Sequence, residues 1–270
     1  MKRKQLKGEL KKNGKIFKKN CMKNKLVLAI SLLIFISCNQ EEKKIESPNF
    51  VFILADDLGY GELGVFGQKI IETPNIDKLA KEGMIFTNHY SGSPVCAPAR
   101  AVLLTGLHTG NSPVRGNDEW NERGDVWSFE AMFKNSELEG QRPLPDSTTT
   151  VADFLKSNGY KTGMVGKWGL GAPNTNSIPN NKGFDFFYGY NCQRQAHTLY
   201  PSHLWKNKER KILKNKIVDK GIFESGVDPN NSKNYDIYNQ NDYAPTLMHD
   251  EALSINDQNK NKKFFLYYAS

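Results

Sequence analysis

A lone cysteine is followed by a proline and an arginine at a spacing that could support chemistry. Cys96 lies two residues before Pro98 and four before Arg100, and an apolar run follows. Proline is favoured in the first turn of a helix, so we expect a helix over residues 98–105 with Cys96 just ahead of its N-terminus. Free N–H groups there favour negative charge, and Arg100 can reach back to Cys96. A buried packing cysteine is the alternative.

The sequence from Cys96 to Gly106, Cys-Ala-Pro-Ala-Arg-Ala-Val-Leu-Leu-Thr-Gly, resembles the signature of the type I sulfatases. In that family the cysteine is oxidised after synthesis to formylglycine, an aldehyde whose hydrate is the nucleophile. The resemblance implies that Cys96 is the precursor of formylglycine and that Arg100 orients the hydrate. It also implies that a formylglycine-generating maturation enzyme is a partner of this chain.

Two adjacent carboxylates follow a continuous apolar run. The run from Asn49 to Ala55 predicts a parallel strand that is buried on both faces, and Asp56 and Asp57 come directly after it. Sites in such folds collect at the carboxyl ends of strands, where hard oxygen ligands suit Ca²⁺ or Mg²⁺. A solvated acidic turn is the alternative for the pair alone. The resemblance favours Ca²⁺ held by Asp56, Asp57 and the modified Cys96.

A lysine between glycines follows another expected strand, at residues 160–165. The sequence Gly-Lys-Trp-Gly-Leu-Gly contains Lys167, which we expect at the same edge of the sheet as Asp56. This stretch resembles the sulfatase motif Gly-Lys-Trp-His-Leu-Gly, whose lysine contacts the sulfate. Gly169 replaces the usual histidine, which assists the nucleophile, and we interpret this as a subfamily difference rather than inactivity.

Two histidines follow a Gly-Phe-Asp-x-Phe-x-Gly turn at residues 183–189 that also resembles the family. A histidine in this part of the chain commonly protonates the leaving group in sulfatases. We assign this role to His197 rather than His203, because the aromatic and proline residues after it indicate an ordered loop. A core histidine is the alternative. The run from Gln193 to Pro201 resembles bacterial sulfatases thought to act on galactose or N-acetylgalactosamine sulfates.

Apolar runs alternate with segments of helical periodicity, which predicts an α/β protein with a mostly parallel central sheet sandwiched by helices. The family resemblance points to the alkaline-phosphatase-like architecture. The expected helices are 74–82, 98–105, 148–157 and 243–257, and the expected strands are 49–55, 84–87, 160–165 and 263–269. The last strand reads as a central one with no covering helix after it. We therefore expect the C-terminal part of the domain, with further metal ligands, to be missing.

The basic character of the chain is confined to its beginning. The 270 residues carry a net charge of +8, whereas the first 48 residues carry 13 Lys or Arg and 4 Asp or Glu. The remainder is therefore slightly acidic, which argues against nucleic acid as a partner.

The first segment of the chain resembles an export signal. Residues 1–37 combine a lysine-rich region with a short apolar run, which predicts a signal peptide whose true start could be Met22. The sequence Phe-Ile-Ser-Cys before residue 39 resembles a bacterial lipobox, so we expect lipid on Cys38. Residues 38–48 would then be a tether and 49–270 the catalytic domain. We expect an exported, membrane-anchored lipoprotein, periplasmic or at the cell surface; cleavage without lipidation is the alternative.

Together these motifs predict a sulfuric ester hydrolase that acts on a sulfated saccharide. Lys167 and Arg100 would hold the sulfate and the hydrate, and His197 would protonate the departing alcohol. Aromatic residues suited to sugar rings, or to ordinary packing, are Trp120, Trp127, Tyr200 and Trp205. A phosphatase or phosphodiesterase of the same superfamily is an alternative, although Cys96 and the scarcity of histidines argue against it. A second alternative is a non-catalytic glycan-binding lipoprotein in which the thiol of Cys96 stays unmodified.

Overall fold

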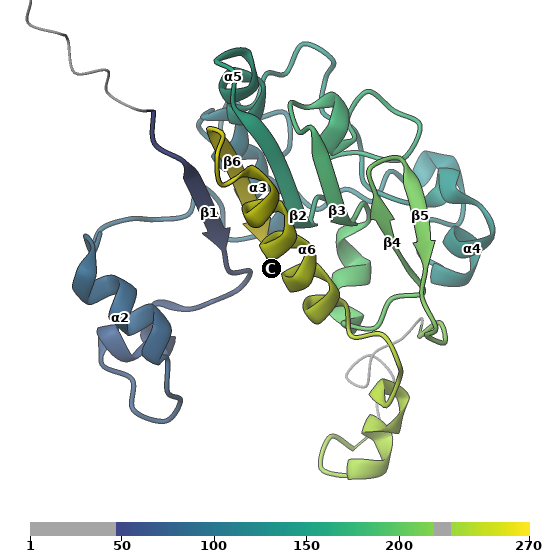
Figure 1. Ribbon diagram of the computed structural model, residues 1–270. Helices are drawn as coiled ribbons and strands as arrows, with labels where there is room; N and C mark the ends of the chain where they lie inside the picture. Colours follow the sequence, from purple (N-terminus) through teal and green to yellow (C-terminus); the bar gives the residue numbers. More distant parts are fainter. Residues whose placement is uncertain (1–46, 219–227) are drawn as a thin grey trace, which may run out of the picture. The chain divides into compact units, whose positions relative to one another are not determined.

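The sheet that organises this chain has six strands and is mostly parallel (Figure 1). The computed structural model describes residues 47–218 and 228–270. The strands are β1 (Phe50–Leu54), β2 (Lys161–Lys167), β3 (Phe186–Tyr190), β4 (His203–Lys206), β5 (Glu209–Ile212) and β6 (Phe264–Ala269). Their order is β1-β6-β2-β3-β4-β5, in which the first four are parallel and β4 and β5 run antiparallel to their neighbours. The predicted sheet type is confirmed.

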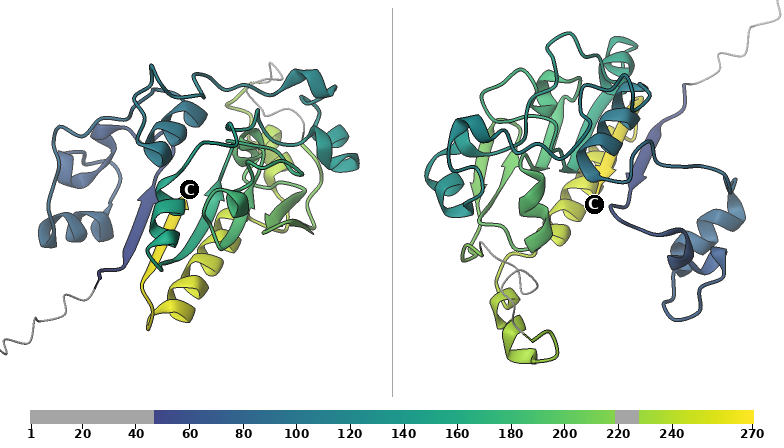
Figure 2. Two further views of the ribbon diagram at one scale, coloured as in Figure 1. Left: turned by 90° about the horizontal axis from the view of Figure 1, so that it is seen from above. Right: turned by 180° about the vertical axis from the view of Figure 1, so that it is seen from behind.

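Helices cover both faces of this sheet, as predicted. Helices α3 (Cys96–Thr105) and α5 (Val151–Ser157) pack on one face, and α6 (Ala244–Asn259) packs on the other. Helix α6 lies in front of the strands in Figure 1 and beyond them in the view from behind in Figure 2. Successive side chains of a strand point to opposite faces. Met164 and Phe187 accordingly join the core beneath α3 and α5, whereas Val165 and Tyr188 join the core beneath α6.

Among the described residues the strand after Asn49 lies at the edge of the sheet, so it is not buried on both faces as predicted. Within the described residues β1 pairs only with β6, and Val51 and Ile53 are 53% and 65% exposed. The central position belongs to β6, whose Leu266 is buried. An apolar run indicates that a strand needs cover, but it does not say which strand lies between two neighbours.

Most helix boundaries agree with the sequence pattern. Helix α2 (Pro74–Glu82) begins after Thr73 and ends before Gly83, as expected. The predicted strand at 84–87 is not formed: this segment is irregular, and Phe86 is 70% exposed. A short helix, α4 (Phe129–Lys134), lies in the long segment between α3 and α5. Its hydrophobic residues pack with buried Cys192.

The beginning of the chain lies outside the described residues. The predicted signal peptide, Met22 and Cys38 all belong to residues 1–46, as does nearly all of the tether. Among residues 47–218 and 228–270, no helix combines the length and apolar character needed to cross a membrane.

Candidate active site

Cys96 is the first residue of α3, so the helix begins two residues earlier than predicted. Its thiol is free and half-buried. The next N–H group, that of Ala97, donates to Oδ1 of Asn117 at 3.1 Å. This long-range contact satisfies one donor of the first turn. It could not be read from spacing, because twenty residues separate the two groups.

Asp56, Asp57 and Cys96 come together as the resemblance implied. One potential ligand atom from each of the three lies within 4.8 Å of the others. The turn that carries the carboxylates is held by β6: Asp56 N donates to Ser270 O at 3.0 Å, and Ser270 N donates to Leu54 O at 3.0 Å. Asp57 has a left-handed φ of 55°, a conformation that is uncommon for non-glycine residues. Adjacent carboxylates in this position are a donor set suited to a hard divalent cation.

Lys167 is the last residue of β2 and lies against this group. Its side chain is only 4% exposed, and its Nζ forms an ion pair with Oδ2 of Asp56. The same nitrogen lies 3.6 Å from Sγ of Cys96. The ammonium therefore offsets the charge of Asp56 and faces the atom that the resemblance assigns as the nucleophile precursor.

Arg100 is buried behind Cys96 and is fixed by two hydrogen bonds. Its Nε donates to the carbonyl oxygen of Trp168 at 2.8 Å, and its Nη2 donates to Oε1 of Gln193 at 2.7 Å. Burial lowers the pKa of Arg100, while Tyr267, Asp56 and Cys96 act in the opposite direction. The guanidinium nevertheless stays charged. Gln193 was missed as a site residue, although its polar type just after a buried strand was a usable signal.

The space at residue 169 is taken by the Arg100–Gln193 pair. Gly169 has a φ of +64°, and a Cβ built there would lie 2.6 Å from Nη2 of Arg100 and 2.9 Å from Cβ of Gln193. No side chain fits without moving this pair. Gly169, which departs from the family motif, therefore leaves the space that the side chains of Arg100 and Gln193 occupy.

The two candidate histidines lie in different surroundings. His197 is exposed in the 3-10 helix Gln193–Thr198, and it lines a pocket of about 300 Å³ together with Asp56, Asp57 and Lys167. Burial of part of the ring lowers the pKa of His197, and the positive charge of Lys167 lowers it further.

His203, in contrast, is fully buried away from this group. Its Nε2 lies 2.9 Å from Oε2 of Glu139, and its Nδ1 lies 3.0 Å from the hydroxyl of Ser202. Arg210 and the indole N–H of Trp205 also donate to Glu139. His203 is a core histidine, so the structure brings only His197 to the pocket.

Comparison with known proteins identifies the family. The sulfatase family model matches residues 48–270. The chain belongs to the sulfatase family. Human arylsulfatase D is 39% identical over 168 residues, which cover 60% of this chain and 26% of arylsulfatase D. Human N-acetylgalactosamine-6-sulfatase is 39% identical over 152 residues, which cover 54% and 26% of the two chains. The chain thus spans about a quarter of the length of the curated relatives it matches.

Solved structures, among them that of a sulfatase, share the fold. Ps i-CgsB in complex with k-i-k-neocarrahexaose is 26% identical, with a TM-score of 0.57 over 83% of this chain and 45% of the other. The sulfatase PsFucS1 from Pseudoalteromonas sp. is 25% identical, with a TM-score of 0.53 over 82% of this chain and 43% of its own. The alkaline-phosphatase-like fold is thereby confirmed for this sulfatase chain.

One further residue of the site lies on β6. The buried hydroxyl of Tyr267 has no hydrogen-bond partner among the described residues, and burial raises the pKa of this group. Tyr267 is near enough to Arg100 and Asp56 to interact with both electrostatically. The position of Tyr267 beside Arg100 and Asp56 could not be predicted from the sequence, because an aromatic residue in a buried strand is expected to pack in the core.

The arrangement combines opposite charges around one atom. Asp56 and Asp57 lie close enough to residue 96 to hold a divalent cation with it, and Lys167, which pairs with Asp56, and the buried Arg100 supply positive charge around the same residue. Such a centre suits a tetrahedral anion, whose oxygens accept charge-assisted hydrogen bonds.

Proposed function

We propose that this sulfatase-family chain carries the nucleophile and the sulfate-binding groups of a sulfuric ester hydrolase that acts on sulfated carbohydrates. The observation that supports it most directly is the contact of one residue, Cys96, with both halves of the site. Its sulfur lies in one cluster with carboxylate oxygens of Asp56 and Asp57, and 3.6 Å from Nζ of Lys167. In the proposed enzyme this sulfur is replaced by the oxygen of formylglycine.

Asp56, Asp57 and the oxidised residue 96 would hold Ca²⁺. The sulfur of Cys96 stands where the hydrate oxygens would lie, so all three ligands would be hard oxygens, as Ca²⁺ prefers. Bound there, Ca²⁺ would act as a Lewis acid towards the sulfate ester, and the hydrate would supply the nucleophile.

Three side chains of this sulfatase would do the remaining work. Lys167 donates hydrogen bonds to a sulfate oxygen and neutralises charge that develops there. Arg100, fixed by Gln193, orients the group at residue 96. His197 lies in the same pocket as Lys167 and, when protonated, gives its proton to the oxygen of the departing alcohol.

A carbohydrate substrate is supported by the relatives and by the surface of the chain. N-acetylgalactosamine-6-sulfatase is among the similar curated proteins, and Ps i-CgsB was solved with a saccharide bound. Trp127 is 59% exposed, with the guanidinium of Arg194 over its ring at 4.7 Å. An exposed indole of this kind offers an apolar face to a pyranose ring. Trp205, by contrast, is mostly buried.

The proposal is tested by the fate of Cys96. We expect peptide mass spectrometry of protein from the native host to show loss of the thiol and a carbonyl that reacts with hydrazide. Cys96→Ala should abolish sulfate release from galactose or N-acetylgalactosamine sulfates. Cys192→Ala is the matched control, because burial raises the pKa of the Cys192 thiol and the residue lies outside the site.

Two outcomes would contradict the proposal. An unmodified Cys96 in protein from the native host would refute the formylglycine mechanism. If that protein also showed no turnover, the result would favour the glycan-binding alternative. Faster hydrolysis of phosphate esters than of sulfate esters would favour the phosphatase alternative instead.

A further inference from the structure

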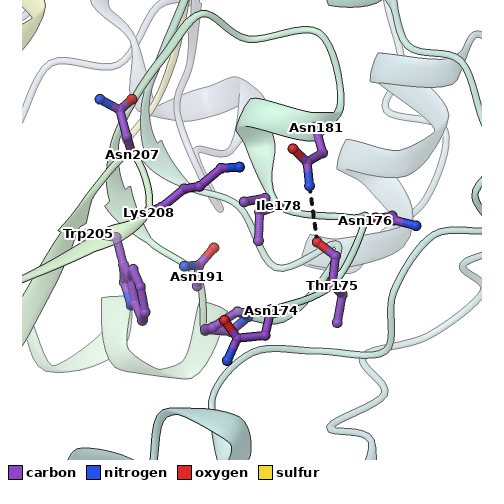
Figure 3. Close-up of a pocket in the computed structure, with 10 residues that line it drawn as sticks. Asn174, Thr175, Asn176, Ile178, Asn181, Asn191, Trp205, Asn207 and Lys208 are labelled. Atoms are coloured by element: carbon purple, nitrogen blue, oxygen red, sulfur yellow. Dashed lines mark hydrogen bonds between the residues drawn. The ribbon is translucent and has the colours of Figure 1, made fainter.

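A second pocket lies between the loop after β2 and the hairpin of β4 and β5, and the proposed reaction does not use it (Figure 3). Its volume is about 260 Å³, close to the lower limit of about 300 Å³ for sites of small molecules. It shares no lining residue with the pocket of Asp56, Lys167 and His197. Its size suits one sugar ring rather than an oligosaccharide.

Carboxamide side chains dominate the lining of this pocket. Five of its ten lining residues are asparagines: Asn174, Asn176, Asn181, Asn191 and Asn207. A carboxamide offers both a donor and an acceptor, which is the pairing that a sugar hydroxyl needs. Ile178 and Trp205 add apolar surface on opposite sides of Asn191 (Figure 3).

The amide of Asn191 is the observation that points to a ligand. Asn191 is only 1% exposed, and its Oδ1 has no hydrogen-bond partner among the described residues. A buried polar atom left unpaired costs about 1–3 kcal/mol, so such atoms are normally satisfied by water or by a ligand. The residue is held in place by its backbone, since its carbonyl oxygen accepts from Gly169 N at 3.2 Å. Figure 3 shows its amide pointing into the pocket.

A second amide is fixed at the hairpin turn. Oδ1 of Asn207 accepts from Phe187 N at 2.9 Å and from Asn180 at 3.1 Å. These bonds orient the side chain, and they leave its Nδ2 without a recorded partner in the described part of the chain. Asn207 is thus a rigid part of the rim of the pocket, and its amide nitrogen points away from Asn191 (Figure 3).

The charge of the pocket is positive. No Asp or Glu lines it, and the ammonium of Lys208 is its single formal charge. Lys208 is exposed and forms no ion pair within the described ranges. The lining holds no carboxylate, histidine or cysteine that could catalyse a reaction, so the chemistry is that of a binding site for an anionic sugar.

We propose that this pocket binds one sulfated pyranose of a glycan, independently of the catalytic pocket. Asn191 bonds a ring hydroxyl, Asn207 lines the rim, and Lys208 pairs with the sulfate. The choice of sulfate as the anionic group rests on the proposed function, whereas the preference for a sugar rests on the amides. Such a site would hold the glycan on the protein while another of its sugars is at Lys167.

The test is a titration followed by NMR on the full chain labelled with ¹⁵N-asparagine. We expect galactose 6-sulfate to shift the side-chain amide signals of Asn191 and Asn207 in a saturable manner. Asn191→Leu keeps the branched shape of the side chain and removes an amide whose oxygen is unpaired, and the pocket has room for the larger methyl groups, so the variant should fold. It should weaken binding about tenfold, read from the Asn207 signal. Lys208→Gln should weaken binding of galactose 6-sulfate several-fold and leave that of galactose unchanged.

Asn176→Ala is the matched control. Asn176 belongs to the same loop, but its amide points away from Asn191 (Figure 3) and donates to Asp146 at 3.1 Å. Its replacement should change the affinity less than twofold. An equal loss of affinity in Asn176→Ala and Asn191→Leu would overturn the proposal.

Three other results would also refute this site. If neither sugar shifts the signals, the pocket holds only water. If inorganic sulfate saturates the same signals as tightly as galactose 6-sulfate, the pocket is an anion site and not a sugar site. Equal binding of galactose and galactose 6-sulfate would refute the role of Lys208. Sulfate release is measured separately, so turnover without binding here refutes this inference alone, and binding without turnover refutes only the proposed function.

Discussion

Gly169→Ala should displace the buried guanidinium of Arg100 without removing any charged group from the site. The added Cβ would lie 2.6 Å from Nη2 of Arg100, so it must displace the guanidinium from Gln193. Alanine at this positive φ costs about 1–2 kcal/mol, and a hydrogen bond to a charged group contributes about 1.5–3 kcal/mol. The free energy of unfolding should therefore fall by about 3–4 kcal/mol, near the middle of the sum of these ranges.

Gly106→Ala separates the two contributions. Gly106 has almost the same φ, +68°, but a Cβ there would meet nothing within 4 Å. Its replacement should cost only the conformational part, about 1–2 kcal/mol. Urea unfolding followed by circular dichroism would measure both variants. The expected difference between them, about 1.5–3 kcal/mol, is the loss of the Arg100–Gln193 bond.

A double-mutant cycle with Gln193→Ala makes the reasoning refutable. Gln193→Ala should destabilise the wild type but add little to Gly169→Ala, because both changes remove the same hydrogen bond. Turnover should fall in Gly169→Ala and stay near the wild-type value in Gly106→Ala. Equal destabilisation by the two alanines, or full additivity with Gln193→Ala, would show that the space at residue 169 is not what fixes Arg100.

Three further predictions concern the metal, the membrane and the buried core. Chelation with EDTA should abolish sulfate release, and added Ca²⁺ should restore it. Added Ca²⁺ should not restore sulfate release in Asp57→Asn. Sulfate release that is insensitive to EDTA would count against the metal. Cys38→Ser should move the protein from the membrane fraction to the soluble fraction, and identical fractionation by immunoblot would refute lipidation. Burial of Glu139 opposes its ionisation, but His203 and Arg210 outweigh this and hold the pKa below the ordinary 4.5. The stabilisation of the fold by ionised Glu139 is thus complete above pH 4.5. It is lost as the pH falls through the lowered pKa of Glu139. The difference in stability between wild type and Glu139→Gln should therefore narrow in acid, and a constant difference would contradict the assignment.

The elements of the site were predictable where a local pattern carries the chemistry. The apolar run before Asp56 indicated a strand, and the glycines around Lys167 indicated a strand end; parallel pairing then brings the two ends to one edge of the sheet. The run could not show that β1 lies at the edge of the sheet among the described residues, because burial depends on strand order. Gln193 bonds Arg100, and Tyr267 lies near Arg100 and Asp56, across long stretches of sequence, so no spacing rule finds them.

The place of β6 between β1 and β2 also determines when the site can form during folding. Asn49 beside β1 bonds Phe264 at the start of β6, across 215 residues of chain. The entropy cost of closing so long a loop comes before the contacts between the two strands can offset it, so this step is slow. Until it happens, the turn of Asp56 has neither its bond to Ser270 nor a sheet that brings it to Lys167. The α3 segment can form early from local contacts. Cys96 would therefore be exposed to solvent until the slow pairing step brings Asp56 and Lys167 next to it.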